Sequence, residues 1–199
     1  VLALGDWVVD AERWQQAHDE AAAMIDAEHK AHPERPGVAL DSLRACIQKI
    51  LPEGVVVALL EELCANGFRR EGTVMSRASH TLKLPATMQA GVDKMRGLLQ
   101  TKPMEPPARK DLTDAKAVRF MIDTGEAIEI STELVMDAGA FKNAVDQIRG
   151  RLQQDGAKTS ELREILGTNR RVIIPLLEKL DRDRVTVRQG DVRVLRKSD

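Results

Sequence analysis

The chain has 199 residues and a formal net charge of −1, with 43% hydrophobic and 31% charged residues. This composition is typical of a soluble, helix-rich globular protein of one to three domains. No apolar run approaches the roughly 20 residues that span a bilayer, so we expect no membrane partner. Cys46 and Cys64 fall on separate expected helices, which favours two buried thiols in a cytoplasmic protein over a disulfide or a metal site.

The small net charge hides an asymmetry along the chain. Residues 140–199 contain 14 Lys and Arg against 9 Asp and Glu, whereas the rest of the chain contains 16 against 22. A basic end on an acidic body predicts one polyanion-binding face. The alternative is a mixed-charge surface that has segregated by chance.

The first 81 residues predict a strand, three helices and a small hairpin. The apolar run 4–9 predicts the strand, and Asp10 is placed to cap a long helix. His32-Pro33 ends that helix, because the residue before proline avoids helical geometry. The other elements expected here are two helices and a hairpin, at 39–50, 54–65 and 68–75.

Residues 82–136 predict the same order of elements. A connector at 82–85 leads into a helix at 86–101, and three prolines in 102–109 then require a loop. The remaining elements expected here are a helix and two strands, at 112–124, 127–132 and 133–136.

The last part of the chain gives the clearest helix-turn-helix pattern. Asp137 starts a long helix, and apolar residues recur helically in 160–166 up to Gly167, which fits a glycine C-cap. Thr168 or Asn169 can cap the following helix. Its apolar residues recur at i, i+3, i+4 and i+7, at Ile173, Leu176, Leu177 and Leu180.

After Asp181 the apolar period changes from helical to two. Valines alternate with polar residues across Gln189-Gly190, which predicts a hairpin whose valines face inward. Helices followed by a hairpin are the sequence form of a winged helix. We therefore expect a mainly α fold with small β-hairpins (α+β), built of tandem winged-helix units at 1–81, 82–136 and 137–199, of which the last binds the polyanion.

The start of the last helix is the main candidate binding site. Thr168, Asn169, Arg170 and Arg171 occupy its first turn, where free N–H groups and the helix dipole favour a phosphate. The two arginines add charge-assisted contacts. Pro175 removes the backbone bond back to Arg171, so either the helix starts later or its first turn is splayed.

A second group of candidates surrounds this turn. Lys158 precedes the first helix of the pair, and Arg188, Gln189 and Arg193 lie at the hairpin tip or on its outward face if the valines face in. Gln189 can pair with a base edge. For the two arginines the alternative is an ordinary solvated strand surface.

The sequence offers no catalytic constellation. It lacks a GxxxxGK[ST] phosphate loop, and its four histidines match no metal-binding spacing. His29 lies on a charged helix and is expected to be solvated, as are the acidic pairs Glu61-Glu62 and Asp181/Asp183. We therefore expect no enzyme active site, no metal site and no cofactor in this chain.

Physical chemistry leaves three classes of partner open. A winged helix can insert a helix into a DNA groove, whereas RNA is gripped through its backbone and splayed bases. A DNA-binding regulator normally has a symmetric dimer interface, of which the sequence shows no sign, so we expect a monomer. A winged-helix protein–protein scaffold is disfavoured by the positive charge gathered on the last unit.

Three stretches resemble one protein family. LREILGTNRRVIIPLLEKLDRDRVTVRQGDVRVL at 162–195 is similar to the last winged-helix unit of the bacterial selenocysteine-specific elongation factors, the SelB family. HPERPG at 32–37 and ANGFRREGTVMSRASHTLKL at 65–84 also resemble the C-terminal extension of that family. The resemblance covers essentially the whole chain.

The resemblance implies a function. Family members carry a GTPase part followed by four winged-helix units, and this chain corresponds to the last three, in agreement with its start without an initiator Met. The final unit is implied to bind an mRNA hairpin (SECIS) after an in-frame UGA codon. The absent part is implied to bind GTP and Mg²⁺ and to deliver selenocysteyl-tRNA at the ribosome, with the first two units as spacers.

Overall fold

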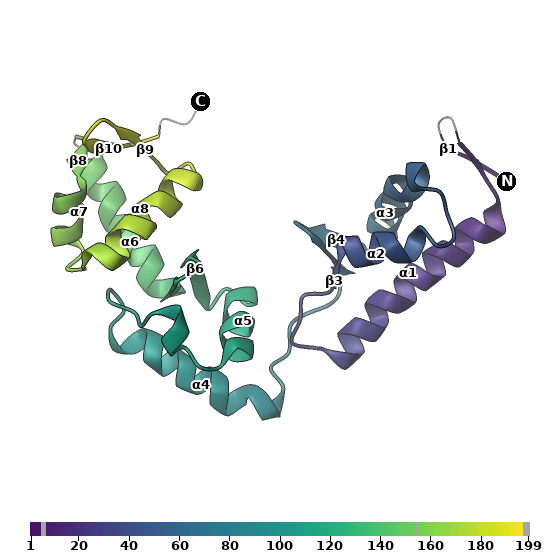
Figure 1. Ribbon diagram of the computed structural model, residues 1–199, viewed down its shortest axis with the longest axis horizontal. Helices are drawn as coiled ribbons and strands as arrows, with labels where there is room; N and C mark the ends of the chain where they lie inside the picture. Colours follow the sequence, from purple (N-terminus) through teal and green to yellow (C-terminus); the bar gives the residue numbers. More distant parts are fainter. Residues whose placement is uncertain (5–6, 154, 197–199) are drawn as a thin grey trace. The chain divides into compact units, whose positions relative to one another are not determined.

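The computed structural model describes residues 1–4, 7–153 and 155–196 of the chain (Figure 1). These residues form two compact units, Val1–Pro85 and Ala86–Asp199, which we describe separately. Among the described residues, none of the helices combines the length and the apolarity that crossing a bilayer requires.

The first unit is a winged helix preceded by a hairpin. Asp10 caps its long helix as expected, since one carboxylate oxygen accepts from the N–H groups of Glu12 and Arg13 at 2.9 and 3.0 Å. The elements in chain order are β1 (Leu2–Leu4), β2 (Trp7–Val9), α1 (Ala11–Ala31), β3 (Val38–Ala39), α2 (Leu40–Ile47), the 3-10 turn η1 (Glu53–Val55), α3 (Val56–Ala65), β4 (Phe68–Glu71) and β5 (Val74–Arg77).

The sheet of this unit has the order β3-β5-β4, with all neighbours antiparallel. The helices enclose one core, because apolar side chains recur at helical spacing on α1, α2 and α3. Its fully buried members include Ile25, Leu43, Leu59 and Met75. The expected helix at 39–50 is shorter in the structure, where α2 ends at Ile47 and turns follow up to Pro52.

The second unit contains two winged helices in succession. The elements of the middle winged helix are α4 (Ala86–Thr101), the 3-10 turn η2 (Arg109–Asp111), α5 (Ala115–Asp123), β6 (Ala127–Ser131) and β7 (Leu134–Asp137). Those of the last are α6 (Ala138–Leu152), β8 (Ala157–Lys158), α7 (Thr159–Ile165), α8 (Arg170–Arg182), β9 (Thr186–Gln189) and β10 (Val192–Leu195). The last winged helix has the sheet order β8-β10-β9.

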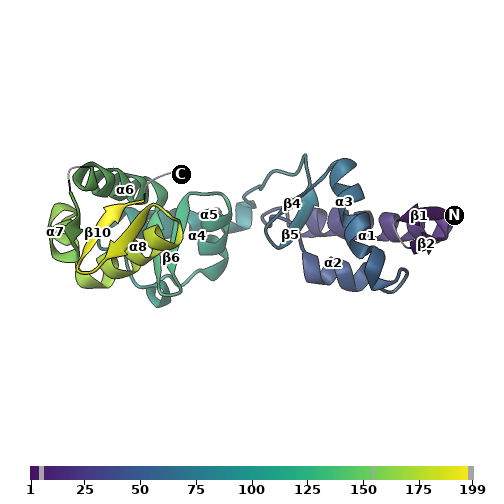
Figure 2. The ribbon, with the colours of Figure 1, turned by 90° about the horizontal axis from the view of Figure 1, so that it is seen from above.

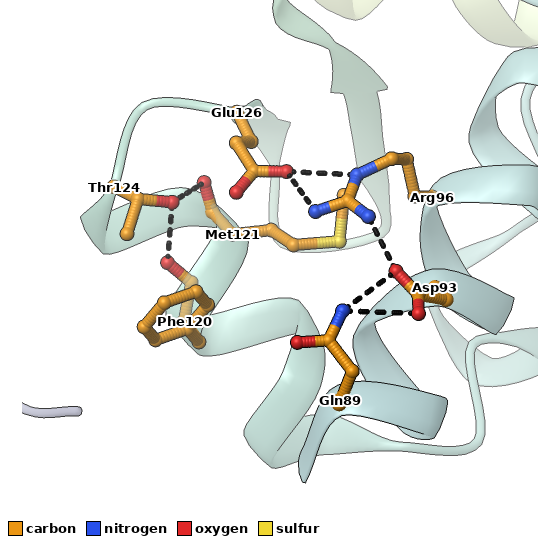
Figure 3. A network of polar contacts seen from close by, with 7 residues as sticks. All are labelled: Gln89, Asp93, Arg96, Phe120, Met121, Thr124 and Glu126. Atoms are coloured by element: carbon orange, nitrogen blue, oxygen red, sulfur yellow. Dashed lines mark hydrogen bonds and ion pairs between the residues drawn. The ribbon is translucent and has the colours of Figure 1, made fainter. Parts of the chain in front are cut away.

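Polar side chains fix the middle wing onto its own helices (Figure 3). Arg96 on α4 donates to the Glu126 carboxylate at the start of the wing, with distances of 3.0 and 2.7 Å, and to Asp93 at 2.6 Å. The hydroxyl of Thr124 donates to the carbonyl oxygen of Phe120 at 2.9 Å and ends α5. The hairpin therefore leaves the helices in a defined direction.

The middle wing also belongs to the core of the last winged helix. β6 contacts both α5 and α8, and Figures 1 and 2 show it between the helices of the two domains. Ile130, Leu134 and Met136 are buried in one cluster with Ile148 of α6. Asp137 ends β7 and caps α6 by accepting from Ala140 N–H at 3.0 Å. These shared residues make 86–199 one compact unit, and the boundary proposed at 136/137 falls inside it.

Candidate nucleic-acid interface

The α7–α8 turn places the candidate residues at the start of a well-formed helix. Gly167 has a φ of 58°, the left-handed conformation that suits glycine after a helix end. Asn169, rather than Thr168, caps α8, because its side-chain oxygen accepts from Val172 N–H at 3.2 Å. The helix begins at Arg170 and contains Pro175, which excludes the first of the two alternatives, a later start.

Burial orients the first turn of α8. The apolar stripe of the helix, which includes Val172, Ile173 and Leu176, is fully buried in the core of the last winged helix. Arg170 is exposed and forms no ion pair within the described part of the chain. The Arg170 side chain is therefore available to an anionic ligand, whereas the Val172 N–H group is already bonded to the Asn169 cap.

The other three residues of the turn contact the middle winged helix. The Thr168 hydroxyl donates to the carbonyl oxygen of Met104, and the Arg171 guanidinium donates to that of Pro106. The Asn169 amide donates to the Glu105 carboxylate at 3.1 Å. The proline-rich loop 102–108 thus lies on the start of α8, and these side chains hold the two domains together in addition to any role toward a ligand.

A groove opens beside this contact. Its volume is about 520 Å³, and its lining residues are Ala108, Arg109, Lys110, Thr132, Glu133 and Arg171. Arg109 is paired with Glu129, so part of its charge is neutralised within the protein. The groove joins cations of both winged helices and lies next to the predicted phosphate site.

The wing differs from expectation in which face is buried. Arg193 is only 9% exposed, and its Nε donates to the Asp181 carboxylate at 3.1 Å. Its guanidinium also donates to the Thr159 hydroxyl at 3.1 Å, and Thr186 bonds to the other Asp181 oxygen at 2.5 Å. The prediction that Arg193 faces outward, opposite inward valines, was wrong. The pleat places Thr186 and Arg193 toward α8, where Asp181 supplies a charged acceptor, and Val187 is exposed instead.

The remaining sheet candidates lie at the surface. Arg188, Gln189 and Lys158 are exposed, and Arg188 Nε donates to the Gly190 carbonyl oxygen at 3.0 Å across the tip. All three belong to the β8-β10-β9 sheet. Among the described residues no hydrogen bond or ion pair joins this group to the α7–α8 turn, so the structure presents the candidates as two groups.

Some acidic residues have structural roles that sequence reasoning missed. Asp181 organises the buried cluster of the wing, and Glu62 accepts a hydrogen bond from the Trp14 indole at 2.9 Å. The expectation that these carboxylates are merely solvated was wrong for both. Their partners lie outside the local window that periodicity covers. In the part of the chain that the structure describes, no three His, Cys, Asp or Glu side chains group so as to hold a metal ion.

Comparisons with known proteins agree on one family. Two family models, both described as "Elongation factor SelB, winged helix", match residues 23–68 and 152–195. The selenocysteine-specific elongation factor of Desulfomicrobium baculatum is 27% identical over 188 residues, which are 85% of this chain and 28% of that protein. The corresponding factor of Escherichia coli (strain K12) is 26% identical over 94% of this chain and 31% of its own length.

A solved structure shares the fold. The crystal structure of a bacterial selenocysteine-specific elongation factor EF-Sec superposes with a TM-score of 0.55 and 15% identity, over 98% of this chain and 32% of that chain. The chain therefore spans about a third of the length of the proteins that it matches. The two matched models and both relatives thus agree that this chain contains winged-helix domains similar to those of the SelB elongation factors.

Proposed function

We propose that this chain binds an mRNA hairpin on behalf of a selenocysteine-specific elongation factor and carries no catalytic site of its own. The observation that carries the proposal is the basic last winged helix, which matches a SelB winged-helix model and exposes Arg170 at the start of α8. The GTPase part, with GTP and Mg²⁺, would lie elsewhere in the full-length factor. That part would deliver selenocysteyl-tRNA to the ribosome in the cytoplasm.

The geometry suits backbone recognition of RNA. A phosphate at the start of α8 would contact the Arg170 guanidinium and would lie at the positive end of the helix dipole. Arg188 and Lys158 would add phosphate contacts on the sheet, and Gln189 at the exposed tip would reach a base edge in a splayed loop. Arg193 is excluded from direct contact, because Asp181 and Thr159 already bind it.

The loop 102–108 forms part of the surface that a ligand approaches at the start of α8. Because Thr168, Asn169 and Arg171 contact this loop, an RNA phosphate at Arg170 approaches a surface made by two winged helices. Lys110 of the adjacent groove would then face the flank of the bound RNA. The middle domain is proposed to help position the RNA rather than to act only as a spacer.

A DNA-binding regulator and a protein scaffold are the competing functions. Competition binding at physiological salt separates them: the chain is mixed with a labelled mRNA hairpin placed after a UGA codon, and unlabelled duplex DNA of equal length is added. We expect hairpin binding to survive an excess of DNA and to weaken steeply with salt, because several phosphates are neutralised. Equal competition by DNA would contradict the RNA assignment.

The site itself is tested by charge removal. Replacing Arg170 and Arg188 together with Ala should weaken hairpin binding by about tenfold or more, since two phosphate contacts are lost. The matched control replaces Lys142 and Arg149 together with Ala, which removes two exposed cations from α6 of the same domain. Circular dichroism should show all variants folded. If the control and the double variant weaken binding equally, only overall charge matters and the assigned site is wrong.

A further inference from the structure

Two histidines of the first unit stack face to face. His29 on α1 and His80, which follows β5, have ring centroids 3.7 Å apart and an angle of 3° between their planes. His29 is therefore half-buried against another ring, and its expected solvation on a charged helix was wrong. The pair brings together two segments about fifty residues apart in sequence.

The segment that carries His80 is held at several points. His80 Nε2 lies 2.9 Å from the Arg35 carbonyl oxygen, and Lys83 N–H donates to the Pro33 carbonyl oxygen at 2.9 Å. Arg77 forms a bidentate pair with Asp26 at 2.8 and 2.7 Å. These contacts fix the segment against α1 and the turn that follows it, so the space between them is preformed.

That space is a cavity of about 250 Å³ with an unusual lining. Its lining residues are His29, Pro33, Arg77, Ser79, His80, Thr81 and Lys83. All except the proline carry side chains that can donate hydrogen bonds, and none is a carboxylate. The surrounding unit is acidic, with 9 Lys and Arg against 13 Asp and Glu in residues 1–85. The cavity is thus a cluster of cationic and hydroxyl groups on a negatively charged unit.

One buried atom in this cluster lacks a partner. His29 Nε2 is shielded from solvent and has no hydrogen-bond partner within the described residues. Buried polar atoms in native proteins are nearly always paired, so this unpaired nitrogen marks an incomplete set of contacts at a residue that lines the cavity. Burial, and then the neighbouring His80, lowers the pKa of His29 from its ordinary value of 6.5, while Asp26 opposes this shift.

We propose that this cavity binds a phosphoryl group. Lys83 would supply positive charge, Arg77 would donate through Nη1, which its pair with Asp26 does not use, the Ser79 and Thr81 hydroxyls would donate hydrogen bonds, and the paired imidazoles would complete the shell. The site lies in the first unit and is separate from the RNA-binding residues of α8. The phosphoryl group could come from a small phosphate compound or from an RNA backbone, which offer the same oxygen acceptors.

The charged neighbours set the pH dependence of binding. Asp26 faces both His29 and Arg77 and remains paired with Arg77, while Glu28 pairs with Arg35 at 3.2 Å. Glu34 lies near His32 and Arg35 on the turn after α1. An anion in the cavity favours the protonated His29 imidazole and so raises the pKa of His29. Binding should therefore strengthen as pH falls through the histidine range and weaken as pH rises above it.

Sulfate is a suitable probe, because it resembles phosphate and does not itself titrate in this range. Sulfate is titrated into the whole chain while backbone amide and histidine-ring NMR signals are recorded. We expect saturable shifts at His29, Arg77 and 79–83, with higher affinity at lower pH. Lys83→Gln should weaken binding about fivefold. The matched control Lys49→Gln, at an exposed position of the same unit, should leave it unchanged.

Two further arms complete the test. His29→Gln should remove the pH dependence, and because Lys83 is exposed, Lys83→Gln gives a readout even if the histidine variant unfolds. If a short RNA stem displaces sulfate, the ligand is a phosphate of an RNA backbone. If the stem does not displace sulfate, the ligand is a small phosphate compound. The proposal is overturned if sulfate shifts no signal around the cavity, or if the Lys83 and Lys49 variants bind sulfate equally.

Discussion

The two arginines of the last wing are paired across the strands and have opposite roles. Arg193 lies opposite Arg188 in the ladder of β9 and β10. Arg193 is buried and bound to Asp181, whereas Arg188 is exposed at the tip. A buried charge is retained only where an opposite charge and hydrogen bonds compensate its desolvation, and the α8 carboxylate provides both.

We predict that Arg193→Ala destabilises the last winged helix. The change removes one of two donors to Asp181 and the donor to Thr159, which should lower the free energy of unfolding by about 1–2 kcal/mol, since Asp181 keeps its bond from Thr186. Urea unfolding followed by circular dichroism measures this change. Arg188→Ala is the matched control and should stay within about 0.5 kcal/mol of the parent chain. Equal stability of the two variants would show that the buried cluster contributes nothing.

The start of α8 combines a helix cap with a contact between domains. One side chain, Asn169, accepts from Val172 N–H through its oxygen and donates to Glu105 through its nitrogen. The cap satisfies a helical N–H group that has no partner within the helix. The donor contact joins α8 to the loop 102–108 and so links the two winged helices.

Two substitutions of Asn169 separate these roles. Asn169→Ala removes both and should destabilise the unit by about 1 kcal/mol. Asn169→Asp keeps the capping oxygen but places a second carboxylate beside Glu105, so α8 should remain stable while the loop loosens. Hydrogen exchange at the Glu105 and Val172 amides distinguishes the outcomes. Slow exchange at both amides in the Asp variant would contradict the assigned contact.

At the scale of the whole molecule, the middle wing couples two folds into one unit. β6 and β7 pack against their own helices and also bury Ile130 and Leu134 in the core of the last domain. The loop 102–108 adds a second, polar contact at the start of α8. An apolar seam and a hydrogen-bonded seam therefore join the middle and last winged helices.

We predict that the polar seam can be weakened separately. Thr168→Val with Arg171→Ala removes two hydrogen bonds to loop carbonyls, which should cost about 1–2 kcal/mol of coupling. The α4 and α5 amides should then exchange hydrogen faster than those of α6 and α8, because the middle domain opens by itself. Arg149→Ala serves as the control. Unchanged exchange in the double variant would assign the coupling to the apolar seam alone.

The helix ends that the sequence predicted correctly depend on interactions between residues that are close together in the chain. Asp10 and Asp137 cap their helices as predicted, because capping depends on neighbours two or three residues away. Gly167 ends its helix region for an equally local reason. The two matched SelB winged-helix models support the predicted fold and family.

Contacts between distant residues could not be predicted in this way. Thr168 and Asn169 form hydrogen bonds with residues 64 positions earlier in the chain, and nothing in the α8 sequence predicts contact with a proline-rich loop. The face of the wing was mispredicted because alternation identifies two faces without saying which one is buried. A charged residue at Asp181 made the polar face of the hairpin, rather than the valine face, the stable one to bury.

The sequence by itself determined the winged-helix order, the helix caps and the gathering of positive charge on the last domain, because periodicity, capping and composition act over short distances. Only the tertiary structure decided which of the charged residues remain available. It paired Arg193 with Asp181, placed Arg171 on the loop 102–108 and stacked His29 on His80, since desolvation and hydrogen bonding depend on groups that folding brings together.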